Sequence, residues 1–131
     1  MAKSVLIVED EIFVAMDLER ILIDAGYKVT AIAADRDSAL ANGEKADIAF
    51  VDINLRDGRT GPAIACDLAE RHGTKVFYVT ANPGQIDPVA ETAIGYIRKP
   101  FTADAIIAAA HLAAVGKLSA NPEITLFGDD A

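Results

Sequence analysis

The sequence has little cysteine, no tryptophan, few aromatic residues and no long hydrophobic run. Its one cysteine, Cys66, cannot form an internal disulfide, which favours a reducing compartment. No apolar run reaches the length that a membrane-spanning helix needs, and Glu9 interrupts the first apolar run too early for a signal peptide. These absences predict a cytoplasmic protein.

Positive charge is also scarce, since 12 Lys and Arg residues face 20 Asp and Glu residues and the net charge is -8. Such a chain repels the phosphates of nucleic acids and of acidic membranes, so neither is an expected partner. The length of 131 residues and the hydrophobic fraction of 52% are typical of one globular domain.

Short β-branched apolar runs alternate with segments of helical periodicity along the chain. We expect strands at about residues 5–8, 28–33, 48–51, 76–79 and 96–97. We expect helices at about residues 12–25, 36–41, 60–72, a short one from residue 87, and 102–115. This alternation predicts an α/β fold, a doubly wound five-stranded parallel sheet flanked by helices on both faces in the flavodoxin-like (βα)5 arrangement.

Four polar clusters each follow an apolar run directly. They are Glu9-Asp10-Glu11, Asp52, Thr80 and Lys99-Pro100. The carboxyl ends of parallel strands meet at one edge of the sheet, so we expect these clusters to form a single site. Any one of them alone is typical of a helix cap or a solvated turn, and the ordered set is what indicates function.

The expected chemistry of this site is phosphoryl transfer assisted by a divalent cation. Crowded carboxylates raise one another's pKa unless a cation joins them, and oxygen ligands with water access suit Mg²⁺. Asp52 follows a central buried strand and is the candidate nucleophile, while Glu9 and Asp10 are placed to hold the metal. Lys99 and Thr80 would contact the oxygens of the phosphoryl group.

At this point the sequence resembles the receiver domains of two-component response regulators. Four segments carry the resemblance and together span roughly residues 4 to 116: Val8-Glu9-Asp10-Glu11, Phe50-Val51-Asp52-Ile53-Asn54-Leu55, Tyr78-Val79-Thr80-Ala81 and Gly95-Tyr96-Ile97-Arg98-Lys99-Pro100-Phe101. The resemblance implies that Asp52 accepts a phosphoryl group. It also implies that Glu9, Asp10, Asp52 and the backbone carbonyl of Asn54 bind Mg²⁺.

The same resemblance implies a conformational switch next to the acceptor. Thr80 and Lys99 would contact the phosphoryl group, and the Tyr96 ring would follow the position of Thr80. The peptide bond between Lys99 and Pro100 is expected to be cis, as it is in this family.

The predicted organisation is a receiver domain at residues 1–116 and a C-terminal tail at 117–131 without an output domain. The resemblance implies a stand-alone bacterial phosphoprotein in a two-component system or phosphorelay. Its phosphoryl donor would be a sensor histidine kinase or a phosphotransfer protein, and it would act on a downstream protein partner. A phosphoryl sink or shuttle is the alternative.

The tail segment 124–127 is expected to form a small extra strand or hook.

The last predicted helix is apolar on most sides, which indicates either a homodimer or partner contact, or tolerance of exposed alanine.

Two other functional classes share parts of the pattern. A flavodoxin-like cofactor binder needs a small-residue phosphate loop where Glu9-Asp10-Glu11 stands. An aspartate-dependent phosphohydrolase needs its nucleophile after the first strand. We therefore expect no enzyme beyond self-catalysed phosphoryl transfer and autodephosphorylation.

Overall fold

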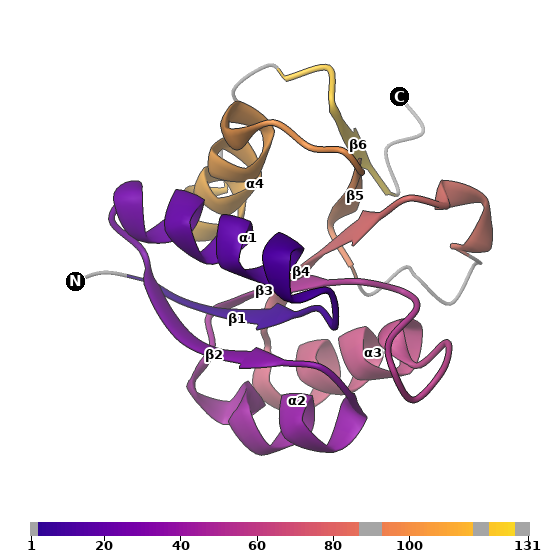
Figure 1. Ribbon diagram of the computed structural model, residues 1–131. Coiled ribbons are helices and arrows are strands. Elements are labelled where there is room, and N and C mark those ends of the chain that lie inside the picture. Colours follow the sequence, from indigo (N-terminus) through magenta and orange to yellow (C-terminus); the bar gives the residue numbers. More distant parts are fainter. Residues whose placement is uncertain (1–2, 87–92, 117–120, 128–131) are drawn as a thin grey trace.

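The computed structural model describes residues 3–86, 93–116 and 121–127, and these form a six-stranded sheet between two helical layers (Figure 1). The strands are β1 (Ser4–Val8), β2 (Lys28–Ala33), β3 (Ile48–Val51), β4 (Lys75–Thr80), β5 (Gly95–Arg98) and β6 (Ile124–Leu126). Their order is β2-β1-β3-β4-β5-β6, in which the first five are parallel and β6 is antiparallel to β5. The predicted five-stranded parallel sheet is confirmed, and the segment expected to be a strand or hook adds a sixth strand.

Two helices cover each face of the sheet in the described part of the chain (Figure 1). The α-helices are α1 (Ile12–Asp24), α2 (Arg36–Asn42), α3 (Gly61–His72) and α4 (Ala103–Val115). One short 3₁₀ turn, Gly43–Lys45, comes after α2, and another, Pro83–Gln85, comes after β4. The helix predicted from residue 87 lies outside the described residues. None of the described helices has the length and hydropathy to cross a membrane.

Local side-chain and backbone contacts explain why these helices begin and end where they do. The Asp35 side chain accepts a hydrogen bond from the Ser38 N–H at the start of α2, and Thr102 caps α4 in the same way through the Ala105 N–H. Gly73 ends α3 in the left-handed backbone region, with a φ of 67°. The predicted boundaries of these helices are therefore correct to within two residues.

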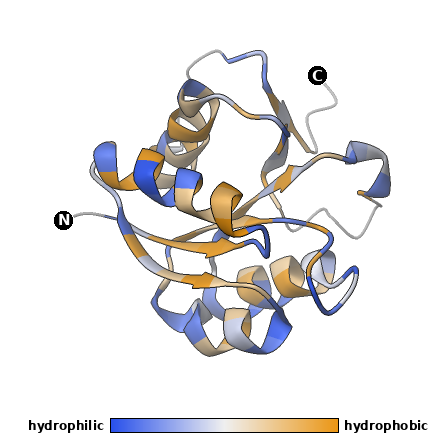
Figure 2. Ribbon diagram, in the orientation of Figure 1, coloured by the Kyte–Doolittle hydropathy of each residue, from blue (hydrophilic) through white to orange (hydrophobic). Residues whose placement is uncertain are grey.

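The sheet separates two hydrophobic cores. Alternate residues of each strand point to opposite faces, so Leu6 and Val51 pack toward α2 and α3 whereas Ile7 and Phe50 pack toward α1 and α4. The strands are largely hydrophobic and the outer side of α2 is hydrophilic (Figure 2). Burial on both faces is the reason that the strands read as continuous apolar runs.

Most of the apolar surface of α4 is buried inside the protein. Ala105, Ile106, Ala109 and Ala110 are buried in the core shared with α1, and Ala108 is buried as well. Ile107 and Val115 are its exposed large hydrophobic side chains. Internal packing thus accounts for much of the apolar character of this helix, and a homodimer through its outer face stays a prediction.

The start of α3 lies directly against the strand end that carries Asp52. The Gly61 N–H donates to the Ile53 carbonyl at 3.0 Å, and a Cβ at Gly61 would collide with the Asp52 backbone. A glycine is required there because the collision is with backbone atoms, which cannot move aside independently.

We expect Gly61→Ala to lower the free energy of unfolding by about 1–3 kcal/mol, the usual cost of overpacking. Gly84→Ala is the matched control, because nothing lies within 4 Å of a Cβ at Gly84 and it should change stability by less than about 0.5 kcal/mol. Urea denaturation followed by circular dichroism measures both. Equal stability of the two variants would contradict this packing.

Candidate functional site

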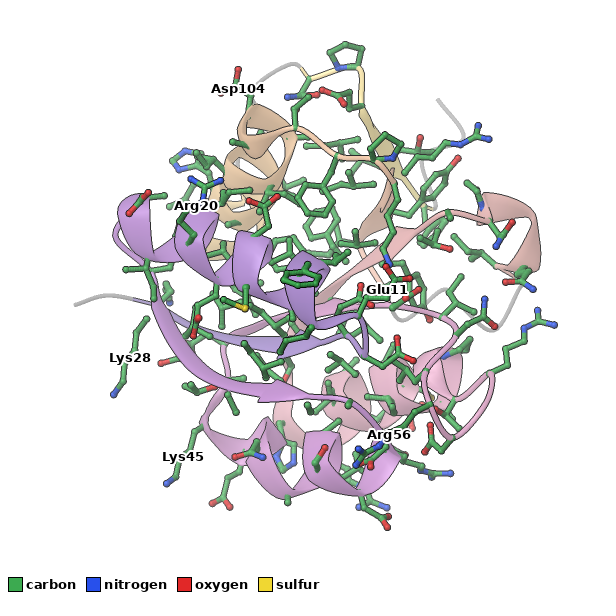
Figure 3. All side chains as sticks on the ribbon, viewed as in Figure 1. Glu11, Arg20, Lys28, Lys45, Arg56 and Asp104 are labelled. Atoms are coloured by element: carbon green, nitrogen blue, oxygen red, sulfur yellow. The ribbon has the colours of Figure 1, made fainter. Side chains whose placement is uncertain are left out.

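Five of the predicted site residues line one cleft at the carboxyl ends of the strands, namely Asp10, Asp52, Asn54, Thr80 and Lys99. Figure 3 shows Glu11 and Arg56 at this end of the molecule, with Lys28 and Lys45 at the opposite end. The cleft has a volume of about 280 Å³. Its lining consists of Asp10, Glu11, Asp52, Asn54, Leu55, Thr80, Ala81, Asn82 and Lys99. Four of the predicted strand ends therefore contribute to a single site, as expected from the topology.

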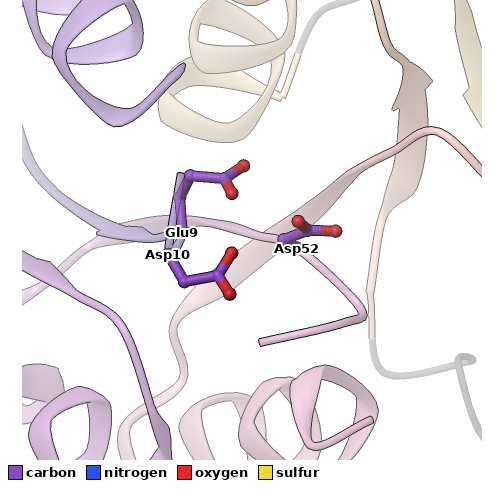
Figure 4. Close-up of side chains that lie close together, drawn as sticks. All are labelled: Glu9, Asp10 and Asp52. Carbon is purple, nitrogen blue, oxygen red and sulfur yellow. The ribbon is translucent and has the colours of Figure 1, made fainter. Parts of the chain in front are cut away.

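Three carboxylates converge beside this cleft (Figure 4). One oxygen each of Glu9, Asp10 and Asp52 lies within 4.8 Å of the other two. Glu9 is only 2% exposed and Asp52 7%, whereas Asp10 is exposed to solvent. The buried pair loses hydration while the third carboxylate remains in contact with water.

Lys99 supplies the positive charge that faces this cluster. Its Nζ lies 2.7 Å from Glu9 Oε1 and donates a hydrogen bond to Asp52 Oδ2 at 3.0 Å. Burial disfavours the charged ammonium, but the hydrogen bonds with Glu9 and Asp52 outweigh it and raise the pKa of Lys99. Lys99 thus remains a cation and joins two carboxylates from different strands.

One ammonium does not compensate the buried Glu9 carboxylate completely. Burial raises the pKa of Glu9 to about 7, and the neighbouring Asp52 charge adds to the increase. The Lys99 ammonium and the hydrogen bond from the Glu11 N–H to Glu9 Oε2, at 3.1 Å, act in the opposite direction. The cluster therefore retains excess negative charge that a further cation would neutralise.

Backbone contacts fix the position of the Asp52 carboxylate. The Asp52 N–H donates to the Val8 carbonyl at 2.9 Å, and Asp52 Oδ1 accepts from the Ile53 N–H at 2.7 Å. Oδ2 faces Lys99. Asp52 is held between two donors at the edge of the cleft, which is a suitable arrangement for a nucleophilic carboxylate.

Thr80 places a hydroxyl on the neighbouring side of the cleft. Its side chain is 1% exposed, and its Oγ1 accepts a hydrogen bond from the Asn82 N–H at 3.0 Å. The hydroxyl proton can then be donated to a group in the cleft. The Thr80 carbonyl accepts from the Lys99 N–H at 2.8 Å, so β4 and the segment after β5 are tied together at the site.

The structure adds contacts that the sequence did not predict. Asn54 Nδ2 donates to Gln85 Oε1 at 2.7 Å, and the Arg59 guanidinium donates to the Gln85 carbonyl. Gln85 belongs to the turn after β4, whereas Asn54 and Arg59 follow β3. These bonds connect the two loops that border the cleft. The spacing of residues in the sequence gives no signal for such contacts between two loops, so they could not be predicted.

Tyr96 is the one predicted site residue that lies away from the cleft. It is on β5, paired with Tyr78, and its half-buried ring lies 5.8 Å from that of Phe127 between centroids. The predicted cis peptide bond between Lys99 and Pro100 is confirmed. Tyr96 thus lies three residues before Lys99, but its ring contacts Phe127 of the C-terminal segment.

The donor set at this site fits a divalent metal ion. All three clustered ligands are carboxylates, one of them is in contact with solvent, and the cluster carries more negative charge than Lys99 neutralises. Hard cations prefer such oxygen ligands and retain water at the open positions. Glu9, Asp10 and Asp52 are the residues that would hold the ion.

The sequence profile described as "Response regulator receiver domain" matches residues 5–111. The chain belongs to the response regulator receiver family. It is 38% identical over 110 residues to the sensory transduction protein RegX3 of Mycolicibacterium smegmatis, an alignment that covers 80% of this chain and 47% of RegX3. The receiver chain thus spans about half the length of that curated relative.

Solved structures agree with this assignment. The signal receiver domain of a modulated diguanylate cyclase from Desulfovibrio desulfuricans has a TM-score of 0.76 at 28% identity, covering 86% of this receiver and 94% of that chain. The receiver domain of the PhyR response regulator from Erythrobacter litoralis has a TM-score of 0.74 at 26% identity, covering 92% and 95%. The receiver family and the receiver fold are therefore shown for this chain.

The raised pKa of Glu9 predicts how stability depends on pH without metal. Between about pH 4.5 and 7 the folded receiver binds this proton more tightly than the unfolded chain does, so the free energy of unfolding falls as pH rises through this range. The loss should be about 3 kcal/mol, since the pKa rises from 4.5 to about 7 and one pKa unit corresponds to about 1.4 kcal/mol.

Glu9→Gln should remove this contribution, because the amide does not titrate. Urea denaturation of both proteins at several pH values, in the presence of a chelator, measures the difference. If the free energy of unfolding changes with pH in the same way in wild type and variant, burial does not raise the pKa of Glu9.

Proposed function

We propose that this receiver accepts a phosphoryl group on Asp52 from a histidine kinase or phosphotransfer protein and signals through protein contacts. The observation that carries the proposal is the Asp52 carboxylate itself, held between the Ile53 N–H and the Lys99 ammonium beside Glu9 and Asp10. Receiver domains interact with histidine kinases, and this geometry supplies an acceptor for the kinase's phosphoryl group.

The proposed step is an in-line displacement at phosphorus. An Asp52 oxygen forms a bond to the phosphorus atom while the bond from phosphorus to the donor's imidazole nitrogen breaks, and the imidazole leaves with that bond's electron pair. Lys99 donates to an oxygen of the transferred group, and the Thr80 hydroxyl donates to another. The product is an acyl phosphate on Asp52.

Mg²⁺ is the proposed metal of the acidic pocket, held by Glu9, Asp10, Asp52 and the Asn54 carbonyl. When bound, it neutralises charge on the phosphoryl oxygens during transfer. Glu9 and Asp10 then act through the metal, whereas Lys99 acts directly. Tyr96 is proposed to change its ring position when Thr80 moves toward the phosphoryl group.

The surface beside the cleft offers a contact for a protein donor. Three large hydrophobic residues at the start of α1 are exposed, namely Ile12, Phe13 and Met16, and Phe13 is 83% exposed. They directly follow the acidic segment that ends at Glu11. An apolar surface at this position suits the docking of a protein that carries the phosphohistidine.

Two alternatives have less support from the site. A phosphoryl sink or shuttle would use the same acceptor and differs in having no dedicated output partner. A phosphohydrolase would have an aspartate nucleophile after the first strand and a second aspartate two residues further on, whereas Glu9-Asp10-Glu11 follows β1 and does not give that pair of aspartates. Multiple turnover of a phosphate ester would favour the hydrolase over the receiver.

We expect acetyl phosphate and Mg²⁺ to add one phosphoryl group per chain, and Asp52→Asn to abolish the addition because it removes the nucleophile. A chelator should lower the rate by about tenfold or more, since the metal neutralises the phosphoryl oxygens. Intact-protein mass spectrometry measures the labelled fraction.

Asp67→Asn is the matched control for this experiment. Asp67 is an α3 carboxylate that pairs with Arg36 on the surface, so its loss should leave labelling at the wild-type level. Labelling of Asp52→Asn to the same extent as wild type would place the acceptor elsewhere.

A second prediction concerns the donor-docking surface on α1. Phe13→Ala should slow transfer from a phosphorylated kinase by roughly fivefold or more, which corresponds to the loss of about 1 kcal/mol of docking energy. A panel of purified, labelled histidine kinases provides the donors, and acetyl phosphate is the small donor for comparison. The acetyl phosphate rate should not change, and equal slowing with both donors would rule out a docking role.

A further inference from the structure

The C-terminal strand β6 covers the outer edge of β5 (Figure 1). It pairs antiparallel, with Gly95 opposite Leu126, Tyr96 opposite Thr125 and Ile97 opposite Ile124. Without it, β5 would be an edge strand with unpaired N–H and C=O groups available to another chain. The edge beside the site is therefore occupied by a segment of the receiver itself.

Side chains on both faces of the sheet hold β6 in place. Ile124 and Leu126 pack against the core formed with α1 and α4. Phe127 packs on the opposite face, with its ring 5.8 Å from Tyr96 and 6.3 Å from Tyr78, and its N–H donates to the Ile94 carbonyl at 2.9 Å. These contacts make β6 a specific partner of β5.

The chain also makes room for the backbone of β6. A Cβ at Gly95 would collide with the Thr125 carbonyl, so the close approach of the two strands requires glycine on β5. At the other end of the segment, the Thr102 hydroxyl donates to Glu123 Oε2 at 2.7 Å. Thr102 is the residue that caps α4, and β6 is thereby tied to that helix as well.

The strand that pairs with β6 leads directly into Lys99, a residue of the proposed phosphorylation site. Lys99 follows β5 directly, and its ammonium binds Glu9 and Asp52. Tyr96, three residues earlier, lies against Phe127. A phosphoryl group on Asp52 would replace the present contact between Lys99 and Asp52 with a contact farther out, and the displacement would act on β5.

We infer that β6 is a phosphorylation-sensitive clasp, closed over β5 in the resting receiver and released when Asp52 is phosphorylated. This inference rests on the proposed function of Asp52. The clasp is a short strand of three residues plus Phe127, and such small units open at low free-energy cost, so a modest shift of β5 and Tyr96 changes the open population. Release would expose the N–H and C=O groups of the β5 edge.

Hydrogen exchange of the full chain tests the clasp. Wild-type receiver is compared before and after treatment with acetyl phosphate and Mg²⁺, with intact mass recording the phosphorylated fraction in the same samples. Amide exchange of residues 121–127 should accelerate about tenfold or more on phosphorylation, while β1 and β3 remain protected. Asp52→Asn should show no acceleration.

Two variants distinguish local opening of β6 from a general increase in amide exchange throughout the receiver. Phe127→Ala should exchange rapidly at residues 121–127 before phosphorylation and show little further change after it. Thr125→Val is the matched control, because the Thr125 side chain is exposed and the variant keeps a β-branched residue in the strand, and it should behave as wild type. Slow exchange in unphosphorylated Phe127→Ala would overturn the role of Phe127 as the anchor.

The readouts distinguish failure of the clasp from failure of the proposed function. If mass shows phosphorylation at Asp52 and residues 121–127 exchange as slowly as before, the clasp is refuted and the acceptor role stands. If no phosphoryl group is added to wild type, the acceptor role and the clasp fail together.

Discussion

Lys99 is the cation on which the acidic end of the sheet depends. The topology of a parallel sheet brings Glu9 and Asp52 together at the strand ends, and two buried carboxylates in that position repel each other. The ammonium bridges both at 2.7 and 3.0 Å, which permits them to share the site. The raised pKa of Glu9 shows that this compensation is incomplete. A site that already needs positive charge is suited to a divalent metal ion.

The same lysine connects the chemistry to the rest of the fold. Its backbone N–H is bonded to the Thr80 carbonyl, its side chain to Asp52, and its strand to β6. In the proposed mechanism, a change of charge at Asp52 acts on β4, β5 and the C-terminal segment through these bonded neighbours. In this account the signal is a change in the population of local states near one sheet edge, and no change of overall fold is required.

The sequence predicted the five parallel strands, the helix boundaries within the described residues and the convergence of Glu9, Asp10, Asp52, Thr80 and Lys99, because alternating periodicity and strand-end position determine these features. It did not predict the bond between Asn54 and Gln85, which joins two loops whose spacing carries no periodic signal. The segment 124–127 was expected as a strand or hook, but its partner strand depends on tertiary packing against Gly95 and Tyr96. Local patterns thus determined the framework, and contacts between distant loops completed the site.

The claim that the acidic residues form one cation-dependent site is tested most directly by calorimetric titration of Mg²⁺. We expect a single site in wild type, with affinity lowered about tenfold or more in Asp10→Asn and Asp52→Asn, since each substitution removes a charged oxygen ligand. Asp67→Asn, whose carboxylate lies on α3 outside the cluster, should bind Mg²⁺ as wild type does. Equal affinity in all four proteins, or no binding to wild type, would show that these carboxylates do not form a Mg²⁺ site.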